Sequence, residues 1–260
     1  MEDNEMMTFW GHLEDLRWSL LRVVAVLLVC MIVCFCAMPY LFDHVVLAPT
    51  TSEFPLYRWL SKLGGGNPLL PDFSDDAFRV EIININVASQ FMTHISTSFW
   101  FALVLVFPYL IFEIWRFIRP ALFPGERHSV GTAFFCGTGM FFLGCAVGYF
   151  LVFPFTFRFL TEYRLSEAIA NQISLNSYIG NFLMMVFIMG LVFEMPLLAW
   201  LLSKLGIVNK AFFRKYRRHA VVVLLILSAF ITPSGDPFTL MIVFVPLYLL
   251  YEAGIRFARP

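Results

Sequence analysis

The carboxylate with the most constrained chemistry in this 260-residue sequence is Glu194, which lies inside the apolar run GLVFEMPLLAW. A carboxylate at membrane depth is costly and usually faces a partner, a cavity or a bundle interior. Lys204 follows ten residues later, about 15 Å along a helix, which places Glu194 near the bilayer midplane. Pro196 predicts a kink with a concave wall beside the carboxyl. Glu194 is therefore a candidate docking point for a partner helix; the alternative is an internal hydrogen bond, for example to the amide of Asn181.

A second set of candidates is acidic and is expected on the cytoplasmic side, where basic residues normally predominate. Glu14 and Asp15 precede the first apolar run, Glu113 ends the second, and Glu126 lies in the loop FIRPALFPGERHS. Carboxylates in these positions indicate a cationic partner, because they form charge-assisted bonds with basic groups. The alternative is that they are ordinary solvated surface residues.

Motifs for other kinds of chemistry are missing. The sequence has no HExxH, no GxSxG, no GxxxxGK and no GxGxxG that opens a helix, so metalloprotease, serine hydrolase, ATPase and dinucleotide-enzyme functions lack support. The five cysteines all lie in apolar segments, away from disulfide-like or zinc-like spacing. We therefore expect no catalytic residues, no metal and no cofactor.

The elements that must position these residues are membrane-spanning helices. Apolar residues make up 60% of the chain and charged residues 14%, a balance that indicates lipid as the main solvent. Four runs are long enough to cross a bilayer as helices, and two runs near the C-terminus, of 13 and 14 residues, are counted as short fifth and sixth spans. The six segments are about 18–40, 96–115, 130–155, 178–202, 220–232 and 238–251. The predicted fold class is all-α, integral membrane.

Charge predicts the orientation of these spans. Between the two sets of loops, the 18 Lys and Arg residues divide 13 to 5, and the richer side should be cytoplasmic. Both termini are then inside, and the segment of about 41–95 forms an extracytoplasmic cap. The acid-rich N-terminus does not resemble a cleavable signal peptide. We interpret residues 1–260 as a single membrane domain.

Small residues and prolines are expected to shape the packing of the bundle. Gly144 and Gly148 form a GxxxG in the third span, which allows a neighbouring helix to approach closely. Packing inside the molecule is the favoured interpretation, and dimerisation is the alternative. Pro49, Pro108 and Pro120 lie within spans or at their ends and should fix where helices bend or stop.

Several blocks closely resemble one family. HLEDLR, FPYLIFEIWRFIRPALFPGERH, GYFLVFPFTFRFL, LVFEMP and ITPSGDPFTL occur in order along nearly the whole chain and are similar to the TatC family, the multispanning component of the twin-arginine translocase. The resemblance implies a glove-shaped, six-span receptor in the bacterial cytoplasmic (inner) membrane. Such receptors recognise twin-arginine signal peptides and help export folded proteins with energy from the proton-motive force.

The resemblance also implies roles for particular residues. The signal-peptide site of the family corresponds to Asp15 in the N-terminal motif and to Glu126 in the first cytoplasmic loop. Asp15 is one methylene shorter than the usual Glu, and Glu14 is a candidate to share its role. Arg127 and Glu113 complete this candidate set. The intramembrane glutamate of the family corresponds to Glu194, and its aromatic and proline scaffold to Pro49, Pro108, Phe117 and Pro120.

The implied partners are twin-arginine signal peptides, small single-span subunits of the TatA or TatB type, the lipid bilayer and further copies of this chain; no nucleic acid is implied. The main alternative function is secondary transport of a small solute, which Glu194 and the proline-bent helices would suit. Carriers usually show internal repeats and paired broken helices, and neither is visible. A membrane scaffold without cargo recognition is the third possibility.

Overall fold

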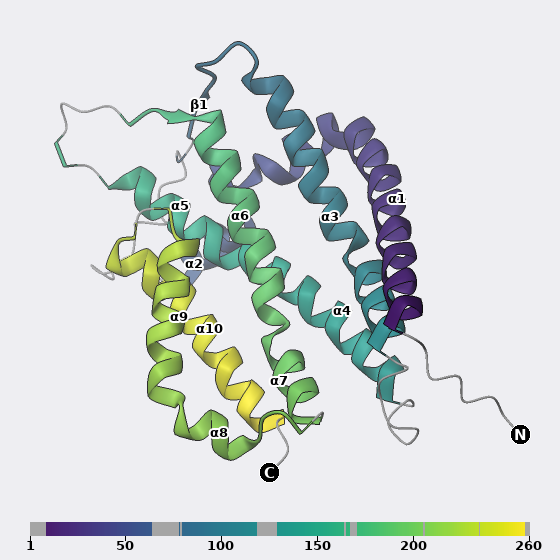
Figure 1. Ribbon diagram of the computed structural model, residues 1–260. Coiled ribbons are helices and arrows are strands. Elements are labelled where there is room, and N and C mark those ends of the chain that lie inside the picture. Colours follow the sequence, from purple (N-terminus) through teal and green to yellow (C-terminus); the bar gives the residue numbers. More distant parts are fainter. Residues whose placement is uncertain are drawn as a thin grey trace, which may run out of the picture.

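The computed structural model describes residues 9–63, 78, 80–118, 129–163, 165–166, 171–204, 206–233 and 235–257. These residues are mostly helical, as the long apolar runs predict (Figure 1). The elements in chain order are α1 Phe9–Leu41, the π-helical turn η1 Phe42–Val46, the 3₁₀ turn η2 Ala48–Thr50, α2 Pro55–Leu63, β1 Ile82–Ile83, α3 Ser89–Ile118, α4 Ser129–Val147, the π-helical turn η5 Gly148–Val152, α5 Phe153–Glu162, β2 Ile173–Ser174, α6 Leu175–Phe193, α7 Met195–Lys204, α8 Lys210–Lys215, α9 Arg217–Ile231 and α10 Pro237–Phe257.

The predicted all-α membrane fold with six spans is confirmed. Five segments of the described chain are long and apolar enough to cross a bilayer: Leu13–Thr50, Ser89–Phe117, Phe134–Glu162, Leu175–Lys204 and Pro237–Arg256. The short span is α9, whose 15 residues reach only about 22 Å at 1.5 Å per residue. The sixth span is longer than we expected. Helix α10 has 21 residues because it continues through Glu252 and Arg256, beyond the apolar run.

Two spans depart from a regular α-helix. The third passes from α4 through the π-helical turn η5 into α5, where Pro154 is the second residue. The fourth breaks at Glu194, between α6 and α7, and Pro196 is the second residue of α7. Pro196 has no N–H that could donate to the carbonyl of Val192. The N–H of Glu194 donates to that carbonyl and to the carbonyl of Leu191. The structure thus has a break between α6 and α7 at the position where Pro196 predicted a kink.

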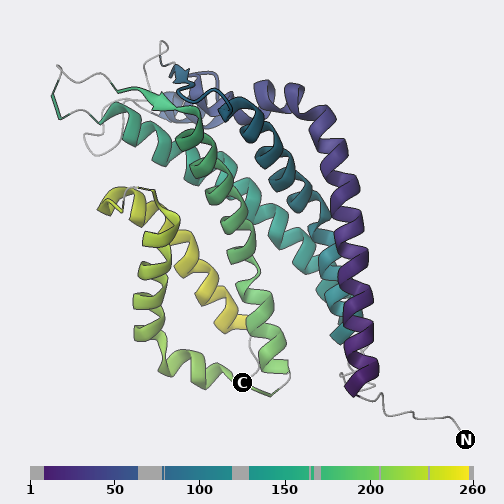
Figure 2. The ribbon, with the colours of Figure 1, turned by 45° about the horizontal axis from the view of Figure 1, so that its top comes forward.

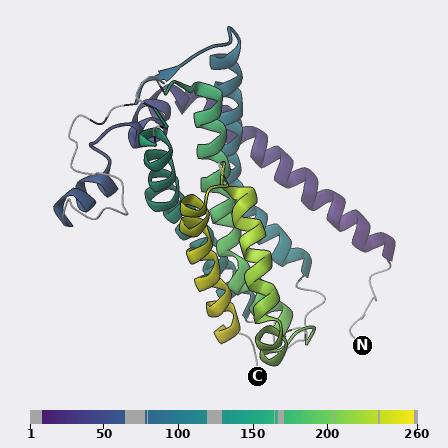
Figure 3. The same ribbon diagram turned by 90° about the vertical axis from the view of Figure 1, so that its left-hand side faces the viewer.

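The centre of the bundle is α6, which packs against α3, α4, α9 and α10 (Figures 1 and 3). Its buried side chains include Tyr178, Phe182, Met185 and Met189. Phe153 of α5 meets the rings of Tyr178 and Phe182 edge to face, an arrangement that the aromatic quadrupole favours. The core is therefore an aromatic and methionine-rich layer around one helix.

The glycines of the third span lie against α6. A Cβ on Gly144 would lie 2.5 Å from the carbonyl oxygen of Met189, and one on Gly148 would lie 3.0 Å from the Cα of Val186. A side chain at Gly144 would therefore force α4 away from α6. This confirms the interpretation that the GxxxG serves packing inside the molecule.

A layer of short elements covers one end of the bundle (Figure 2). Strands β1 and β2 pair in parallel, with Ile82 opposite Ile173. The preceding segment pairs with the turn before α2, since the N–H of Val80 donates to the carbonyl of Thr50 at 3.1 Å. Helix α3 begins at Ser89, inside the segment that we assigned to the cap. Most of the tract LSKLGGGNPLLPDFSDD lies outside the described residues.

The other end of the bundle gathers the start of α1, the end of α3, the start of α4, helix α8 and the end of α10 (Figures 1 and 2). The described ends of the chain are therefore on the same side, as an even number of crossings requires. The candidate carboxylates of the first and second spans lie at this end.

Candidate functional site

A polar cluster joins α1 to α3 near the end where α1 begins. Nε and Nη2 of Arg22 donate to Oε1 and Oε2 of Glu113, each at 3.0 Å. The hydroxyl of Tyr109 donates to the same Oε1 at 2.9 Å, and Oγ of Ser19 accepts from Arg22 at 2.9 Å. A second guanidinium, that of Arg116, lies 3.9 Å from the carboxylate. The Glu113 side chain is only 3% exposed, so its negative charge is compensated by a bidentate partner within the bundle.

Glu14 and Asp15 lie at the same end of the molecule. Helix α1 begins at Phe9, so both residues are part of this helix, ahead of the apolar run that begins at Trp18. Both side chains are exposed, and no described residue forms an ion pair with either. They are accessible to a cation from outside the bundle.

The loop that follows α3 carries the remaining candidates for this site. Glu126, Arg127 and Pro120 lie outside the described residues, which resume at Ser129. Their roles remain predictions. Helix α3 ends at Ile118, at the same end of the bundle as the start of α1 (Figure 1).

Glu194 occupies the break between α6 and α7 and is 7% exposed. Its Oε1 atom is buried and has no hydrogen-bond partner among the described residues. Asn181, the amide that we considered as an internal partner, lies 13 residues earlier on α6, about 20 Å along a helix. A buried polar atom without a partner is costly, so Glu194 differs from an ordinary satisfied residue of the bundle.

A glycine gives the Glu194 carboxyl its space. Gly137 of α4 is buried, and a Cβ built on it would lie 3.3 Å from Oε2 of Glu194 and 2.8 Å from Cδ2 of Leu197. The carboxyl therefore lies directly over the backbone of α4. Any side chain at position 137 would have to displace it or Leu197.

A third charged cluster lies at the opposite end. Arg158 of α5 is fully buried, pairs with Glu162 at 2.6 Å and lies over the rings of Tyr57 and Phe78 at 5.1 and 4.3 Å. The hydroxyl of Tyr57 donates to the carbonyls of Pro49 and Pro154, and burial raises the pKa of this phenol. The cluster connects α2 and its neighbours to α5 through cation–π and hydrogen-bond contacts.

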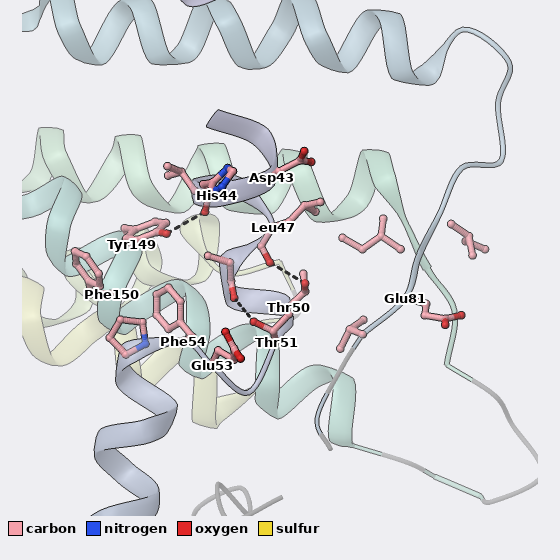
Figure 4. Close-up of a pocket in the computed structure, with 16 residues that line it drawn as sticks. Asp43, His44, Leu47, Thr50, Thr51, Glu53, Phe54, Glu81, Tyr149 and Phe150 are labelled. Atoms are coloured by element: carbon pink, nitrogen blue, oxygen red, sulfur yellow. Dashed lines mark hydrogen bonds between the residues drawn. The ribbon is translucent and has the colours of Figure 1, made fainter. Parts of the chain in front are cut away.

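The same end holds an open cavity of about 1060 Å³. Figure 4 shows an aromatic wall of Phe54, Tyr149 and Phe150, with the carboxylates of Asp43 and Glu81 at the edges. The hydroxyl of Tyr149 donates to the carbonyl of Val45 across its floor. Among the described residues, no three His, Cys, Asp or Glu side chains are close enough to hold a metal ion. The cavity belongs to the covering layer and lies away from the candidate recognition residues.

A family model described as Sec-independent protein translocase protein (TatC) matches residues 11–246 of the chain. The chain belongs to the TatC family. It is 34% identical to the TatC protein of Blattabacterium sp. subsp. Periplaneta americana, over 98% of this chain and 95% of that protein. It is 35% identical to the TatC protein of Deinococcus radiodurans, over 96% of this chain and 85% of that protein.

Solved structures agree with this assignment. A crystal structure described as the twin arginine translocase receptor TatC superposes with a TM-score of 0.74 and 26% identity, covering 95% of this chain and 97% of that one. A second, in the detergent DDM, gives a TM-score of 0.77 and 25% identity, covering 96% and 100%. This TatC-family chain is thus a multi-pass membrane component of Sec-independent protein translocation.

The predicted scaffold residues of this TatC-family chain have varied surroundings. Pro49 is buried in η2, and Pro108 lies inside α3 without interrupting it. Phe117 is in the last turn of α3, and Pro196 is buried in the first turn of α7. Only Pro196 of these four stands beside a break in a span.

Sequence reasoning missed two ion-paired clusters. Arg22 was used only as one of the basic residues that predict the orientation of the spans. It lies inside the first apolar run, at a membrane depth similar to that of Glu113 in the second. Arg158 stands in the aromatic block FPFTFRFL, where a lone cation indicates a buried partner. Both arginines could have been singled out as charges in apolar runs, but their partners depend on which helices are neighbours.

Proposed function

We propose that this chain binds twin-arginine signal peptides at the end of the bundle where α1 begins, and that this end faces the cytoplasm. Support comes from the 13-to-5 division of basic residues and the positive-inside rule. Further support comes from the likeness to a protein described as the twin arginine translocase receptor. Membership in a translocase family favours this function over solute transport.

In this proposal, the paired arginines of the signal peptide meet carboxylates presented by α1 and by the loop after α3. Asp15 and Glu126 are the principal contacts, and Glu14 and Arg127 are their neighbours. Asp15 is exposed and has no ion-pair partner among the described residues, which supports this role. Carboxylates hold guanidinium groups with parallel hydrogen bonds, which explains why lysine is a poor replacement for arginine.

We further propose that Glu194 docks the transmembrane helix of a small single-span subunit of the TatA or TatB type. The buried Oε1 without a partner is the observation that carries this assignment. A charged carboxylate at mid-bilayer costs about 2.5–3.5 kcal/mol on insertion scales. A polar side chain on the partner helix would supply the missing hydrogen bond and offset part of that cost.

The assembled complex would export folded proteins across the bacterial inner membrane. The proton-motive force would supply the energy, and copies of the chain would associate within the complex. The chain itself would perform no covalent chemistry and hold no cofactor. Its part would be to bind the signal peptide and the partner helix.

The recognition proposal is tested with a photoreactive twin-arginine peptide and membrane vesicles that contain the full chain. Glu126→Lys and Asp15→Lys should each reduce crosslinking strongly, because each reverses a carboxylate that meets a guanidinium. Glu53→Lys, which reverses an exposed carboxylate at the other end, is the matched control and should have no effect. Unchanged crosslinking in both site variants would refute the proposal.

The docking proposal is tested by crosslinking from the fourth span to the single-span subunit. Glu194→Gln should retain much of the crosslinking, since an amide can donate and accept hydrogen bonds, whereas Glu194→Leu should lose it. Export of a folded twin-arginine cargo is measured in parallel. Equal crosslinking and export in the wild type and Glu194→Leu would reduce Glu194 to a structural residue.

The orientation is tested with single cysteines in a cysteine-free background. Positions near the start of α1, in α8 and after α10 should resist an impermeant thiol reagent applied to intact cells. A cysteine at Thr51, beside the open cavity, should react. Labelling at either end of the chain would reverse the proposed orientation.

A further inference from the structure

We propose that an apolar cavity between α3, α4 and α6 binds one acyl chain of a membrane phospholipid. The cavity has a volume of about 220 Å³ and lies where these three helices pack against one another (Figure 1). It is separate from Glu194 and from the carboxylates at the end of the bundle where α1 begins.

Two helices supply bulky walls for the cavity. Helix α3 contributes Trp100 and Val104, and α6 contributes Val186 and Phe187. The rings of Trp100 and Phe187 meet edge to face at 4.9 Å, which sets the distance between the two walls. All four side chains are only half-buried, so the cavity is not sealed within the protein.

Helix α4 leaves the space open because its side chains are small at this height. Cys145 and Ala146 line the cavity from this side. Helix α4 cannot move closer to α6 to fill it, since a Cβ on Gly190 of α6 would lie only 2.6 Å from Sγ of Cys145. The two helices are already in close contact beside the cavity.

Tyr149 separates this cavity from the open cavity of the covering layer. Tyr149 and Val45 line both cavities, and the Tyr149 hydroxyl donates to the Val45 carbonyl at 2.9 Å. Among the described residues that line the apolar cavity, none is charged and only Tyr149 carries a hydroxyl. Water would find few partners there, so a suitable occupant is apolar and enters from the lipid.

The depth of the cavity matches the acyl chains of one leaflet. Leu183 and Val186, which line it, are the ninth and twelfth of the 30 residues in the span Leu175–Lys204. The cavity therefore lies in the half of the bilayer next to the covering layer, where hydrocarbon chains fill the membrane. Leu143, one turn away on α4, is exposed, as expected for a surface in contact with lipid.

The size of the cavity suits part of an alkyl chain. An empty void would forfeit the dispersion contacts of the side chains around it. An apolar cavity of roughly 150 Å³ stays dry and binds benzene or xenon, so one of about 220 Å³ has room for a segment of a chain. The headgroup stays outside, and the site therefore selects the chain and not the headgroup.

The test uses the purified full chain in vesicles of phosphatidylethanolamine and phosphatidylglycerol. A trace of phospholipid carries a diazirine in the middle of one acyl chain, and the labelled residues are assigned by mass spectrometry after illumination. Labelling at Val186 should exceed labelling at the exposed Ile32 of α1 roughly threefold, because an enclosed chain contacts protein on several sides. The ratio should be the same whichever headgroup carries the diazirine chain.

Variants that fill the cavity should remove this excess. Ala146→Phe places a ring in the space from α4, and labelling at Val186 should fall roughly fivefold relative to Ile32 because no room remains for a chain. Leu143→Phe adds the same ring at a position of α4 that is 55% exposed; it is the matched control and should leave the ratio unchanged. If Ala146→Phe does not fold, Val104→Phe fills the same space from α3 and should give the same result.

Three results would overturn the proposal. The first is labelling at Val186 that does not exceed labelling at Ile32, and the second is an excess that persists in both filled variants. The third is a photoreactive residue at position 186 that crosslinks, in native membranes, to another protein and not to lipid, which would assign the cavity to a partner helix. An excess that the filled variants abolish and the control retains establishes the acyl-chain site.

Discussion

Two buried carboxylates of this chain have opposite surroundings. Glu113 receives hydrogen bonds from Arg22 and Tyr109 and joins α1 to α3. Glu194 lies at the break between α6 and α7, and its buried Oε1 has no partner in the described part of the chain. Burial is nearly equal, at 3% and 7% exposure. The difference lies in whether neighbouring helices supply donors.

This difference separates two uses of a charge in a membrane protein. A paired carboxylate contributes to the stability of the fold. When the carboxylate is removed, its cationic partner is left without a counter-charge, which destabilises the protein. An unpaired buried carboxylate destabilises the isolated chain, and the proposed docking of a partner helix at Glu194 would offset that cost. Stability measurements should therefore respond in opposite directions at the two positions.

The largest effect is expected from Glu113→Leu. This change leaves Arg22 without its bidentate partner, and the midpoint of thermal unfolding in detergent should fall by roughly 5–15 °C. Replacing both residues, with Arg22→Met and Glu113→Leu together, should recover most of the loss because no charge remains unpaired. A midpoint that stays constant in the single variant would show that the pair contributes nothing to the fold.

Glu194→Leu should have a smaller effect of the opposite sign. Removing a buried polar atom without a partner should leave the midpoint unchanged or raise it by about 2–5 °C in the isolated chain. The same variant should lose crosslinking to the single-span subunit. A strong fall in the midpoint would mean that the Glu194 carboxyl stabilises the isolated chain, as the Glu113 carboxyl does.

Gly137→Ala tests whether the Glu194 carboxyl needs its space. The new Cβ would lie 2.8 Å from Leu197 Cδ2 and 3.3 Å from Oε2 of Glu194. The Leu197 side chain can rotate away, so the midpoint should fall by only about 2–4 °C. Crosslinking to the partner helix should decrease, because the carboxyl is displaced. Gly139→Ala, where a Cβ meets nothing within 4 Å, is the matched control.

The smallest effect is expected at an exposed ion pair. Arg58 and Glu53 approach to 3.9 Å with side chains that are 63% and 82% exposed. Solvent screening makes such pairs nearly neutral for stability, so Arg58→Ala should not change the midpoint measurably. If Arg58→Ala lowered the midpoint as much as Glu113→Leu does, solvent exposure would not explain the different contributions of the Arg58–Glu53 and Arg22–Glu113 pairs.

The spans could be predicted from sequence because each rests on a local property. A run of about 20 apolar residues must be helical in lipid, where every backbone polar group needs a partner within the segment. Pro196 predicted a kink in the fourth span for an equally local reason, the missing N–H, and the structure has a break there. The helix ends were less predictable: α1 begins nine residues before Trp18, where we placed the start of the span, because polar residues also adopt helix outside lipid.

The candidate carboxylates could be recognised by type and position, but their partners could not. Glu113 ends the second apolar run and Glu194 lies inside the fourth, but neither position shows whether a neighbouring helix supplies a partner. Arg22 is 91 residues from Glu113 along the chain, and their pairing exists only because α1 lies against α3. The sequence by itself determined which segments enter the membrane and where charge stands in them. Tertiary structure alone decided which of these charges is neutralised, because neutralisation depends on distances between helices that no local pattern encodes.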